Sequence, residues 1–281
     1  MRRSVRRPIS WGPQRGRRSG AKLRLLIAGG IAIFALVSFL GRRQINQYTG
    51  EKQFVALVPQ QEIALGLQAA PQMMAEYGGL DPDAASQMLI DRIGQRLVDR
   101  SDVGTTPWQF EFHLLADPGT VNAFALPGGQ IFMTDALFRG LETEGQVAGV
   151  LGHEIGHVIA RHSAQRMAKQ SLTQGLIGAV AVASESASQA EMAEMVGAMV
   201  NMKYGRGDEL ESDTLGVMIM AEAGYDPRAM IAVMDVLEAA GGGARQADFF
   251  STHPSPDNRR GEIRAAIDRV FPNGVPDGLT P

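Results

Sequence analysis

The sequence predicts an α+β protein dominated by helices, with a small antiparallel sheet and one transmembrane helix ahead of the folded domain. Three observations lead to this fold class. An uncharged apolar run stands near the N-terminus, two short strand patterns meet at a Pro-Gly-Gly turn, and the chain from residue 135 onward shows mainly helical spacing. The 281 residues are enough for one sizeable domain and an appendage.

The apolar run comprises the sixteen residues from Leu25 to Leu40. A helix needs about 20 mostly apolar residues to cross a hydrocarbon core of about 30 Å, and flanking Lys and Arg side chains extend the span by snorkelling. Residues 1–43 carry eleven basic residues and no acid, and nine of the eleven precede the run. Because basic residues favour the cytoplasmic side, we expect the N-terminus in the cytoplasm.

Four segments follow from this assignment: a basic cytoplasmic tail at 1–24, a transmembrane signal anchor at 25–41, a linker at 42–60 and a folded domain at 61–281. We expect a single-pass inner-membrane protein with its domain in a periplasm or, alternatively, one in the mitochondrial inner membrane. A cleaved signal peptide is less favoured because no A-x-A-like site follows Leu40. The continuous apolar run argues against a transit peptide alone.

Charge and cysteine content exclude several classes of protein. The residues after position 43 have a formal net charge of −14, so the folded domain would repel phosphate backbones and we expect no nucleic-acid partner. The chain has no cysteine, which rules out disulfides and thiolate metal sites. Any metal centre must therefore use histidine and carboxylate ligands.

Periodicity gives the order of elements in the folded domain. It predicts helices at 61–77 and 83–99, strands at 108–115, 122–126 and 130–133, a turn at 127–129, and helices through most of the remainder. The last two strands meet at the turn and predict a hairpin.

The most informative residues are the two histidines of the His-Glu-Ile-Gly-His segment. On a helix, His153 and His157 lie about 40° apart around the axis, so both imidazoles face one point and can share a metal ion. Glu154 lies about 100° further round, where it suits a general base acting on water better than a third ligand. The apolar flanks indicate a buried helix, in which three ionisable side chains need partners.

A catalytic zinc ion requires a third protein ligand, which the downstream acids can supply. Glu209 and Asp213 are four residues apart on one helix face. We assign Glu209 to the metal and Asp213 to the hydrogen bond that fixes the tautomer of a ligating histidine. Glu211 lies on another face and is expected to be solvated. His162, five residues after His157, would point away from the metal if the helix continues.

Two further histidines have different expected roles. His113 lies within a strand pattern and is expected to be structural. His253 lies in a loop that Pro254 and Pro256 stiffen. Such a loop could hold His253 over the metal, where it would bond a tetrahedral oxyanion or cap the ion when substrate is absent.

Together these segments resemble metallopeptidase family forty-eight, the zinc gluzincins that include HtpX-type proteases, CAAX prenyl proteases and periplasmic or mitochondrial quality-control peptidases. The similarity runs from about residue 59 to 260. The segments that carry it are H-E-I-G-H at 153–157, E-L-E-S-D at 209–213, S-T-H-P-x-x-x-x-R at 251–259, N-A-F-A-L-P-G-G at 122–129 and A-G-Y-D-P at 223–227.

The resemblance implies a gluzincin-like fold and one zinc ion per chain, held by His153, His157 and Glu209 with Glu154 as the base. It implies that His253 and Arg259 line the site and steady the transition state. It also implies an edge strand that binds extended substrates. The substrate-binding residues expected on that basis are Asn122, Ala123, Phe124, Ala125, Gly128 and Gly129.

The chain departs from the multi-spanning branches of that family because only one segment is long enough to cross a membrane. The run Gly175–Ala183 is too short and predicts a buried or lid helix. The resemblance therefore favours a single-anchor endopeptidase that acts on misfolded or misassembled envelope proteins, with proteins or peptides as substrates. The alternatives are a zinc-containing chaperone or scaffold with a latent protease site, and a binding module in which the histidine pair is accidental.

Overall fold

The computed structural model describes residues 17–183, 204–241, 249–254 and 258–281. The chain forms two compact units. Among the described residues, one unit comprises 17–41 and 170–183, and the other comprises 42–169, 204–241, 249–254 and 258–281. Helix α6 (His162–Ala183) begins in the second unit and ends in the first. The model confirms the predicted fold class, with a helix-rich second unit that contains small sheets.

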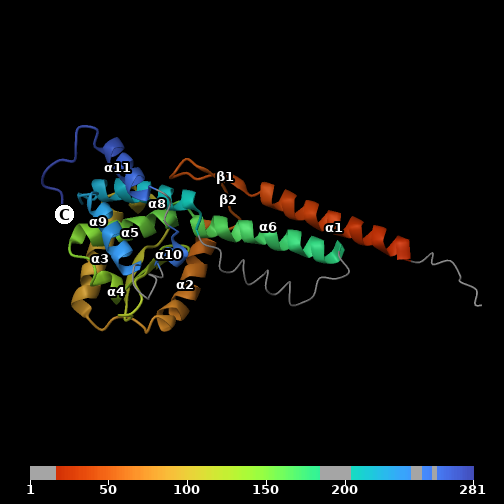
Figure 1. The fold of residues 1–281 in the computed structure, drawn as a ribbon, viewed down its shortest axis with the longest axis horizontal. Coiled ribbons are helices and arrows are strands. Elements are labelled where there is room, and N and C mark those ends of the chain that lie inside the picture. Colours follow the sequence, from red (N-terminus) through yellow and green to blue (C-terminus); the bar gives the residue numbers. More distant parts are fainter. Residues whose placement is uncertain (1–16, 184–203, 242–248, 255–257) are drawn as a thin grey trace, which may run out of the picture. The chain divides into compact units, whose positions relative to one another are not determined.

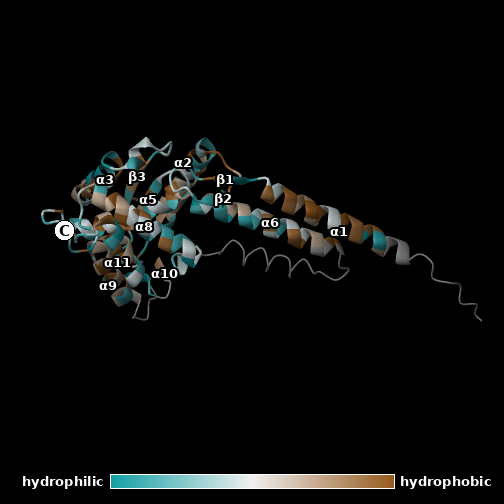
Figure 2. Cartoon of the chain, turned by 90° about the horizontal axis from the view of Figure 1, so that it is seen from above, coloured by the Kyte–Doolittle hydropathy of each residue, from teal (hydrophilic) through white to brown (hydrophobic). Residues whose placement is uncertain are grey.

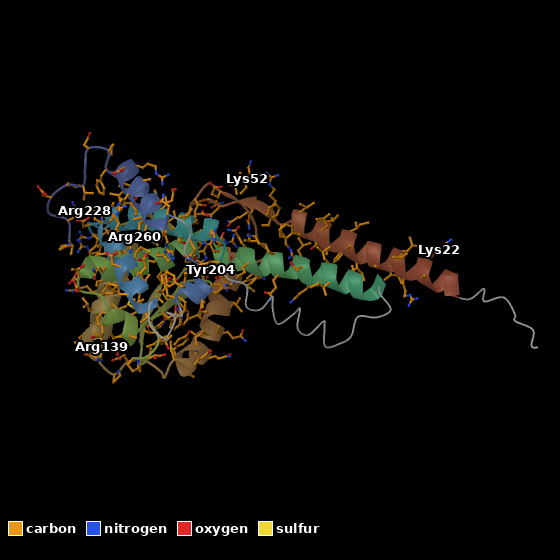
Figure 3. The ribbon with its side chains drawn as sticks, in the orientation of Figure 1. Lys22, Lys52, Arg139, Tyr204, Arg228 and Arg260 are labelled. Atoms are coloured by element: carbon orange, nitrogen blue, oxygen red, sulfur yellow. The ribbon has the colours of Figure 1, made fainter. Side chains whose placement is uncertain are left out.

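The first unit contains helix α1 (Arg17–Leu40) and the distal part of α6. The stretch Ala21–Leu40 is 20 residues long with a mean hydropathy of 2.3, and it is the single candidate span among the described residues. Its apolar surface is visible along α1 in Figure 2, and Lys22 lies near its start in Figure 3. Gly175 of α6 packs against Ala35, since a Cβ atom at Gly175 would lie 2.7 Å from that of Ala35. The Gly175–Ala183 run is thus part of a helix packed on α1.

The second unit begins with an antiparallel hairpin of β1 (Arg43–Ile45) and β2 (Lys52–Phe54). This hairpin lies within the 42–60 segment that the sequence assigns to a linker. Asn46, in the connection between β1 and β2, is buried and donates a hydrogen bond of 2.7 Å from Nδ2 to the carbonyl oxygen of Ile159. The segment therefore packs on the folded unit, which continues into α2 (Pro59–Glu76).

A second sheet has the strand order β3-β5-β4 and is mixed rather than antiparallel throughout. Its strands are β3 (Glu111–Leu115), β4 (Ala123–Ala125) and β5 (Gln130–Thr134). The hairpin predicted at the Pro-Gly-Gly turn is confirmed, because β4 and β5 pair antiparallel. β3 pairs parallel to β5, since the chain passes from β3 to the far edge before β5 enters between them. β4 is consequently an edge strand.

His113 on β3 has the structural role expected of it. Its Nε2 lies 2.9 Å from Oε1 of Gln130, and its ring stacks on Phe132 with centroids 4.8 Å apart. Both contacts join β3 to β5 within the sheet.

Helices enclose the central helix α5 (Glu144–Ile159), of which every residue from Gly145 to Ile159 is buried. Thr143 caps its N-terminus by accepting a hydrogen bond from the Gln146 amide. Figure 1 shows α5 among the other helices of this unit. Those helices are α3 (Ala84–Asp99), the short α4 (Asp135–Phe138), α8 (Arg206–Glu222), α9 (Ala229–Gly241), α10 (Phe249–Thr252) and α11 (Arg259–Val270).

Two glycines bring α5 and α8 close together. A Cβ atom at Gly156 would stand 2.9 Å from the carbonyl oxygen of Ser212, and one at Gly152 would stand 3.5 Å from the Cα atom of Gly216. Larger residues would separate the helices, so these glycines set the distance between the residues that α5 and α8 contribute to one site.

Candidate metal centre

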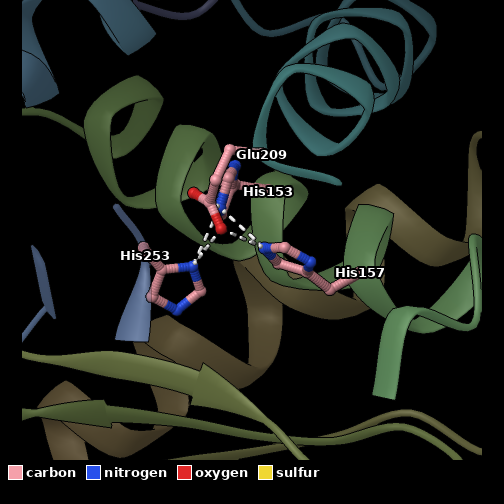
Figure 4. A group of neighbouring side chains, drawn as sticks. All are labelled: His153, His157, Glu209 and His253. Atoms are coloured by element: carbon pink, nitrogen blue, oxygen red, sulfur yellow. Dashed lines mark hydrogen bonds and ion pairs between the residues drawn. The ribbon is translucent and has the colours of Figure 1, made fainter. Parts of the chain in front are cut away.

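His153 and His157 project from α5 toward the same point, as their four-residue spacing predicts. Both are buried, with their Nε2 atoms 3.0 Å apart and their ring planes nearly perpendicular. Figure 4 shows the two rings meeting a carboxylate from α8. The remaining ring nitrogens face away from this point and have partners of their own.

The carboxylate belongs to Glu209, in the first turns of α8. Gly205 caps this helix, and its amide donates a hydrogen bond of 2.9 Å to the Asp208 carboxylate. Glu209 is fully buried, with Oε1 3.4 Å from Nε2 of His157 and Oε2 3.5 Å from Nε2 of His153. Burial opposes ionisation of Glu209, but its contacts with the histidines hold its pKa below the usual value. The three expected zinc ligands thus lie together.

Asp213 supports His153 from one turn further along α8. Its Oδ1 lies 2.8 Å from Nδ1 of His153. Arg259 donates to Asp213 through Nε at 2.7 Å and Nη2 at 2.8 Å, and its Nη1 lies 3.4 Å from Oε2 of Glu209. Burial alone would lower the pKa of His153, yet hydrogen bonds that its ring donates to Asp213 and Glu209 raise the pKa to about 9 in the absence of a metal ion. Arg259 is itself buried among these acids.

His253 follows the short helix α10 and completes a group of four. Its Nδ1 lies 3.1 Å from Oε1 of Glu209 and 3.4 Å from Nε2 of His153. Its ring stacks on Phe249, with centroids 4.4 Å apart. The side chain is fully buried, so the loop holds this histidine inside the site.

Glu154 is fully buried on the same helix as the two ligand histidines. Neither of its carboxylate oxygens has a hydrogen-bond partner among the described residues, and Oε1 lies 3.7 Å from Nε2 of His253. Burial raises the pKa of Glu154. A raised pKa brings a carboxylate nearer to the working range of a general base at neutral pH.

The side chains present fit a zinc ion. One atom from each of His153, His157, Glu209 and His253 lies within 4.8 Å of the others. Ligands of tetrahedral zinc at their usual bond lengths lie about 3.3 Å apart, close to the separations found here. Oε2 of Glu209 is buried without a hydrogen-bond partner. A divalent cation between these lone pairs would satisfy it.

Three residues near this centre were not predicted to contribute. His162 lies against the outer nitrogen of His157, and Glu211 lies against the far nitrogen of His162. Tyr204, which is labelled in Figure 3, stacks on the His157 ring with centroids 4.2 Å apart. Its hydroxyl lies 3.0 Å from Oγ of Ser163. The Gly205-x-x-Asp208 helix start just after Tyr204 is a sequence signal that could have placed this residue beside Glu209.

The expected substrate-binding residues divide into two groups. Ala125 lines a small cavity together with His157, so the end of β4 reaches the metal centre. Asn122 and Ala123 are buried, and Nδ2 of Asn122 donates to the Tyr77 hydroxyl, while Phe124 stacks on Phe132.

Gly128 and Gly129 belong to the turn and do not face the metal centre. Both have positive φ, and Cβ atoms there would collide with the backbones of Ile63 and Gln109. The structure gives these glycines a conformational role in the turn, and their contact with substrate stays a prediction.

The fold and the site define a metallopeptidase of the gluzincin type, with two histidines on the buried helix α5 and a glutamate on α8. Residues 84–267 match the model of peptidase family M48, which is more than half of the chain. The chain belongs to this family of zinc metallopeptidases, as the sequence resemblance predicted. Membership of a peptidase family implies protein substrates.

Relatives occur in bacteria and mitochondria. The β-barrel assembly-enhancing protease of Escherichia coli strain K12 is 32% identical over 194 residues, covering 65% of the chain and 39% of that protein. The mitochondrial metalloendopeptidase OMA1 of Schizosaccharomyces pombe is 29% identical over 241 residues, covering 84% and 68%. The corresponding protein of Arabidopsis thaliana is 35% identical over 150 residues, covering 52% and 29%. The chain thus spans less than half the length of the bacterial relatives it matches.

Proposed function

We propose that the protein is a membrane-anchored zinc endopeptidase that hydrolyses peptide bonds in misfolded or misassembled envelope proteins. The observation that carries this proposal is the buried, unpartnered carboxylate of Glu154 beside a group of metal-binding side chains. A buried carboxylate without a partner is costly in a merely structural site. The same carboxylate is well suited to accept a proton from an attacking water.

His153, His157 and Glu209 would hold the zinc ion. When bound, zinc supplies Lewis acidity, which polarises the scissile carbonyl and acidifies water at neutral pH. Glu154 accepts the proton of the attacking water and delivers it to the leaving amine. Its environment supports both steps, because burial raises the pKa of Glu154 and so favours transient protonation.

His253 and Arg259 have different proposed roles. His253 touches the reacting region, since its Nε2 faces Glu154, and it is suited to bond the oxyanion once substrate displaces it from Glu209. Arg259 acts as a positioning residue. Its guanidinium is buried against Asp213 and Glu209, so it orients Asp213, which in turn orients His153.

The edge strand β4 is the proposed binding surface for an extended substrate. The amide of Leu126 bonds the carbonyl of Gln130, and the amide of Thr134 bonds the carbonyl of Asn122, so these positions pair with β5. Backbone groups alternate along an antiparallel strand, so those of Ala123 and Ala125 point to the outer edge. A substrate strand that pairs there would run past the cavity that Ala125 shares with His157.

The proposed compartment follows from the charge distribution. The basic residues before Leu25 favour a cytoplasmic N-terminus, a 25–41 anchor and a catalytic domain in the periplasm. A mitochondrial inner membrane is the alternative, and the likeness to mitochondrial metalloendopeptidases supports it. Substrates in the envelope are proposed because the bacterial relatives are β-barrel assembly-enhancing proteases.

Glu154→Gln in the full chain, purified in detergent and loaded with zinc, tests the proposal. We expect zinc content and thermal unfolding to match the parent, and casein cleavage to be lost. The matched control is Glu144→Gln, a half-buried position at the start of the same helix, paired with Arg92, that should leave cleavage unchanged. Casein cleavage by Glu154→Gln at the parental rate would refute the proposed chemistry.

A second candidate function is a zinc-containing chaperone or scaffold whose protease site stays latent. His253 favours it, because a fourth protein ligand would close the coordination sphere of a tetrahedral zinc ion. The two functions separate in a His253→Ala variant. A latent site should cut casein faster after the substitution, whereas an enzyme that needs His253 should cut more slowly.

A further inference from the structure

We infer that His162 is a positioning residue of the metal centre, which together with Glu211 fixes the ligand His157 in the tautomer that leaves Nε2 free for zinc. The inference rests on the proposed zinc site. It adds a second set of hydrogen bonds that orients a ligand histidine, separate from the hydrogen bond between Asp213 and His153. The sequence predicted that Glu211 is solvated and that His162 points away from the metal, as a surface residue or as one that lies outside the set of ligands.

His162 lies directly behind His157. Its side chain is buried, and its Nδ1 lies 2.8 Å from Nδ1 of His157, with the ring planes inclined by 72°. On its other side, Nε2 of His162 lies 3.2 Å from Oε2 of Glu211, a residue that is 28% exposed. The three side chains form a continuous row that leads from the metal centre to the surface.

The hydrogen positions along this row follow from its two ends. Glu211, as a carboxylate, can only accept, so Nε2 of His162 must carry the proton that it donates. A neutral His162 then has a bare Nδ1 that accepts from Nδ1–H of His157. Since His157 carries its proton on Nδ1, its Nε2 is unprotonated and faces His153 and Glu209.

The reverse arrangement fails at the metal centre. If His162 donated from Nδ1, then His157 would have to carry its proton on Nε2, where it would block a metal ion. A neutral His162 in that form would also set a bare Nε2 against the Glu211 carboxylate. The Ser212 hydroxyl lies 3.4 Å from Nδ1 of His162, too far to compete with His157 at 2.8 Å.

The left-handed turn between two helices places His162 in this position. Helix α5 ends at Ile159, Arg161 has a φ of 59°, and α6 begins at His162. A continuing helix would direct residue 162 away from residue 157, about 140° around the axis. The turn instead folds His162 back against the outer nitrogen of His157.

One turn of α8 therefore supports both ligand histidines. Glu209 contributes a ligand, Asp213 bonds the outer nitrogen of His153 directly, and Glu211 bonds the outer nitrogen of His157 through His162. Glu211 faces away from Glu209 along the helix, which is why a bridging residue is needed.

Zinc affinity, measured by competition with a chelator in the full chain in detergent, tests the inference. Loss of such a supporting contact weakens metal binding about 10- to 100-fold, and we expect this for His162→Ala. His162→Gln should bind zinc within about threefold of the parent, because an amide can accept from His157 and donate to Glu211. His113→Gln is the matched control and should be without effect.

A spectroscopic measurement on the unmodified protein keeps the test independent of folding. With nitrogen-15-labelled histidine, the zinc-loaded chain should show His157 protonated at Nδ1 and His162 at Nε2. A His162 protonated at Nδ1, or parental zinc affinity in His162→Ala, would overturn the inference alone. A parent that binds no zinc would overturn both the proposed metal centre and the inference.

Discussion

Gly156 on the central helix lies against the backbone of Ser212, so that a Cβ atom at Gly156 would stand 2.9 Å from the Ser212 carbonyl oxygen and 3.1 Å from its Cα atom. The contact lies between His153 and His157 on one helix and between Glu209 and Asp213 on the other. The distance between α5 and α8 depends on the absence of a side chain at Gly156, and the size of the metal centre depends on that distance.

Gly156→Ala should therefore weaken zinc binding as well as stability. The backbone of Ser212 cannot move aside cheaply, so we expect a loss of about 1–3 kcal/mol in the free energy of unfolding and a lower zinc affinity. Urea unfolding of the zinc-free chain and chelator competition measure the two effects. Gly178→Ala is the control, since a Cβ atom there meets nothing within 4 Å. Equal zinc affinity in Gly156→Ala and the parent would show that the helix spacing does not set the site.

A second prediction concerns the pH dependence of the contact between Asp213 and His153 in the zinc-free protein. The pKa of Asp213 is lowered: burial opposes this, but Arg259 and His153 outweigh it. Stability from a depressed carboxyl pKa is present above its unfolded value of 3.8 and is lost as the pH falls through the folded value. The pKa of His153 is raised to about 9, so its contribution is complete below 6.5 and is lost as the pH rises through about 9.

Asp213→Asn should thus be most destabilising between about pH 4 and 6.5. Removing one partner of a buried ion pair costs about 3–5 kcal/mol. We expect a loss of that order at pH 5.5 and a smaller loss at pH 3, because below pH 3.8 the carboxyl of the unfolded chain is protonated and the stability that the lowered pKa contributes declines. Urea unfolding of the zinc-free parent and variant at these pH values provides the comparison. A loss that stays constant from pH 3 to 5.5 would contradict the assigned pKa shift of Asp213.

The sequence predicted those features of the site that depend on spacing within one helix. His153 and His157 face one point because they are four residues apart, and Glu209 and Asp213 share a face for the same reason. The predicted fold class is confirmed, and so is the hairpin at Pro127 to Gly129. Each of these follows from local periodicity or from turn chemistry.

What the sequence did not predict depends on the backbone between elements. The position of His162 follows from the left-handed Arg161, and arginine gives no local signal for that conformation. The parallel pairing of β3 with β5 is decided by the path of the whole chain rather than by either strand. The partner of Arg259 could not be identified because Asp213 lies 46 residues away in sequence.

The turn at Arg161 leads to a third prediction. A non-glycine residue in the left-handed region costs about 1–2 kcal/mol, which glycine does not incur. The Arg161 side chain offsets this cost by donating from Nε to Oε1 of the buried Glu62 at 2.8 Å and from Nη2 to the Leu57 carbonyl. Arg161→Ala loses these contacts and keeps the strain, whereas Arg161→Gly loses the contacts alone.

We therefore expect Arg161→Ala to be less stable than Arg161→Gly by about 1 kcal/mol, and both to be less stable than the parent. Urea unfolding of the zinc-free chains measures the order. Because the turn also positions His162, zinc affinity should fall in the same order. If the alanine variant proves as stable as the glycine variant, the left-handed turn is not present in solution.

The last prediction concerns the outer edge of β4. Proline lacks the amide hydrogen and is tolerated on an edge strand where that amide faces outward. Ala125→Pro should therefore leave the sheet intact, because the neighbouring Leu126 amide is the one that bonds β5. The substitution removes a donor that an extended substrate would use. The loss of one hydrogen bond of about 1 kcal/mol, together with the bulk of the ring, should lower kcat/KM for casein about tenfold.

Two controls separate substrate pairing from other effects of the Ala125→Pro substitution. Zinc affinity should stay within twofold, and Ala125→Gly, which keeps the amide, should cut casein at close to the parental rate. A small chromogenic amide that cannot pair with a strand should be cleaved equally by both variants. A proline variant that cuts casein like the glycine variant would mean that substrates do not pair with this edge.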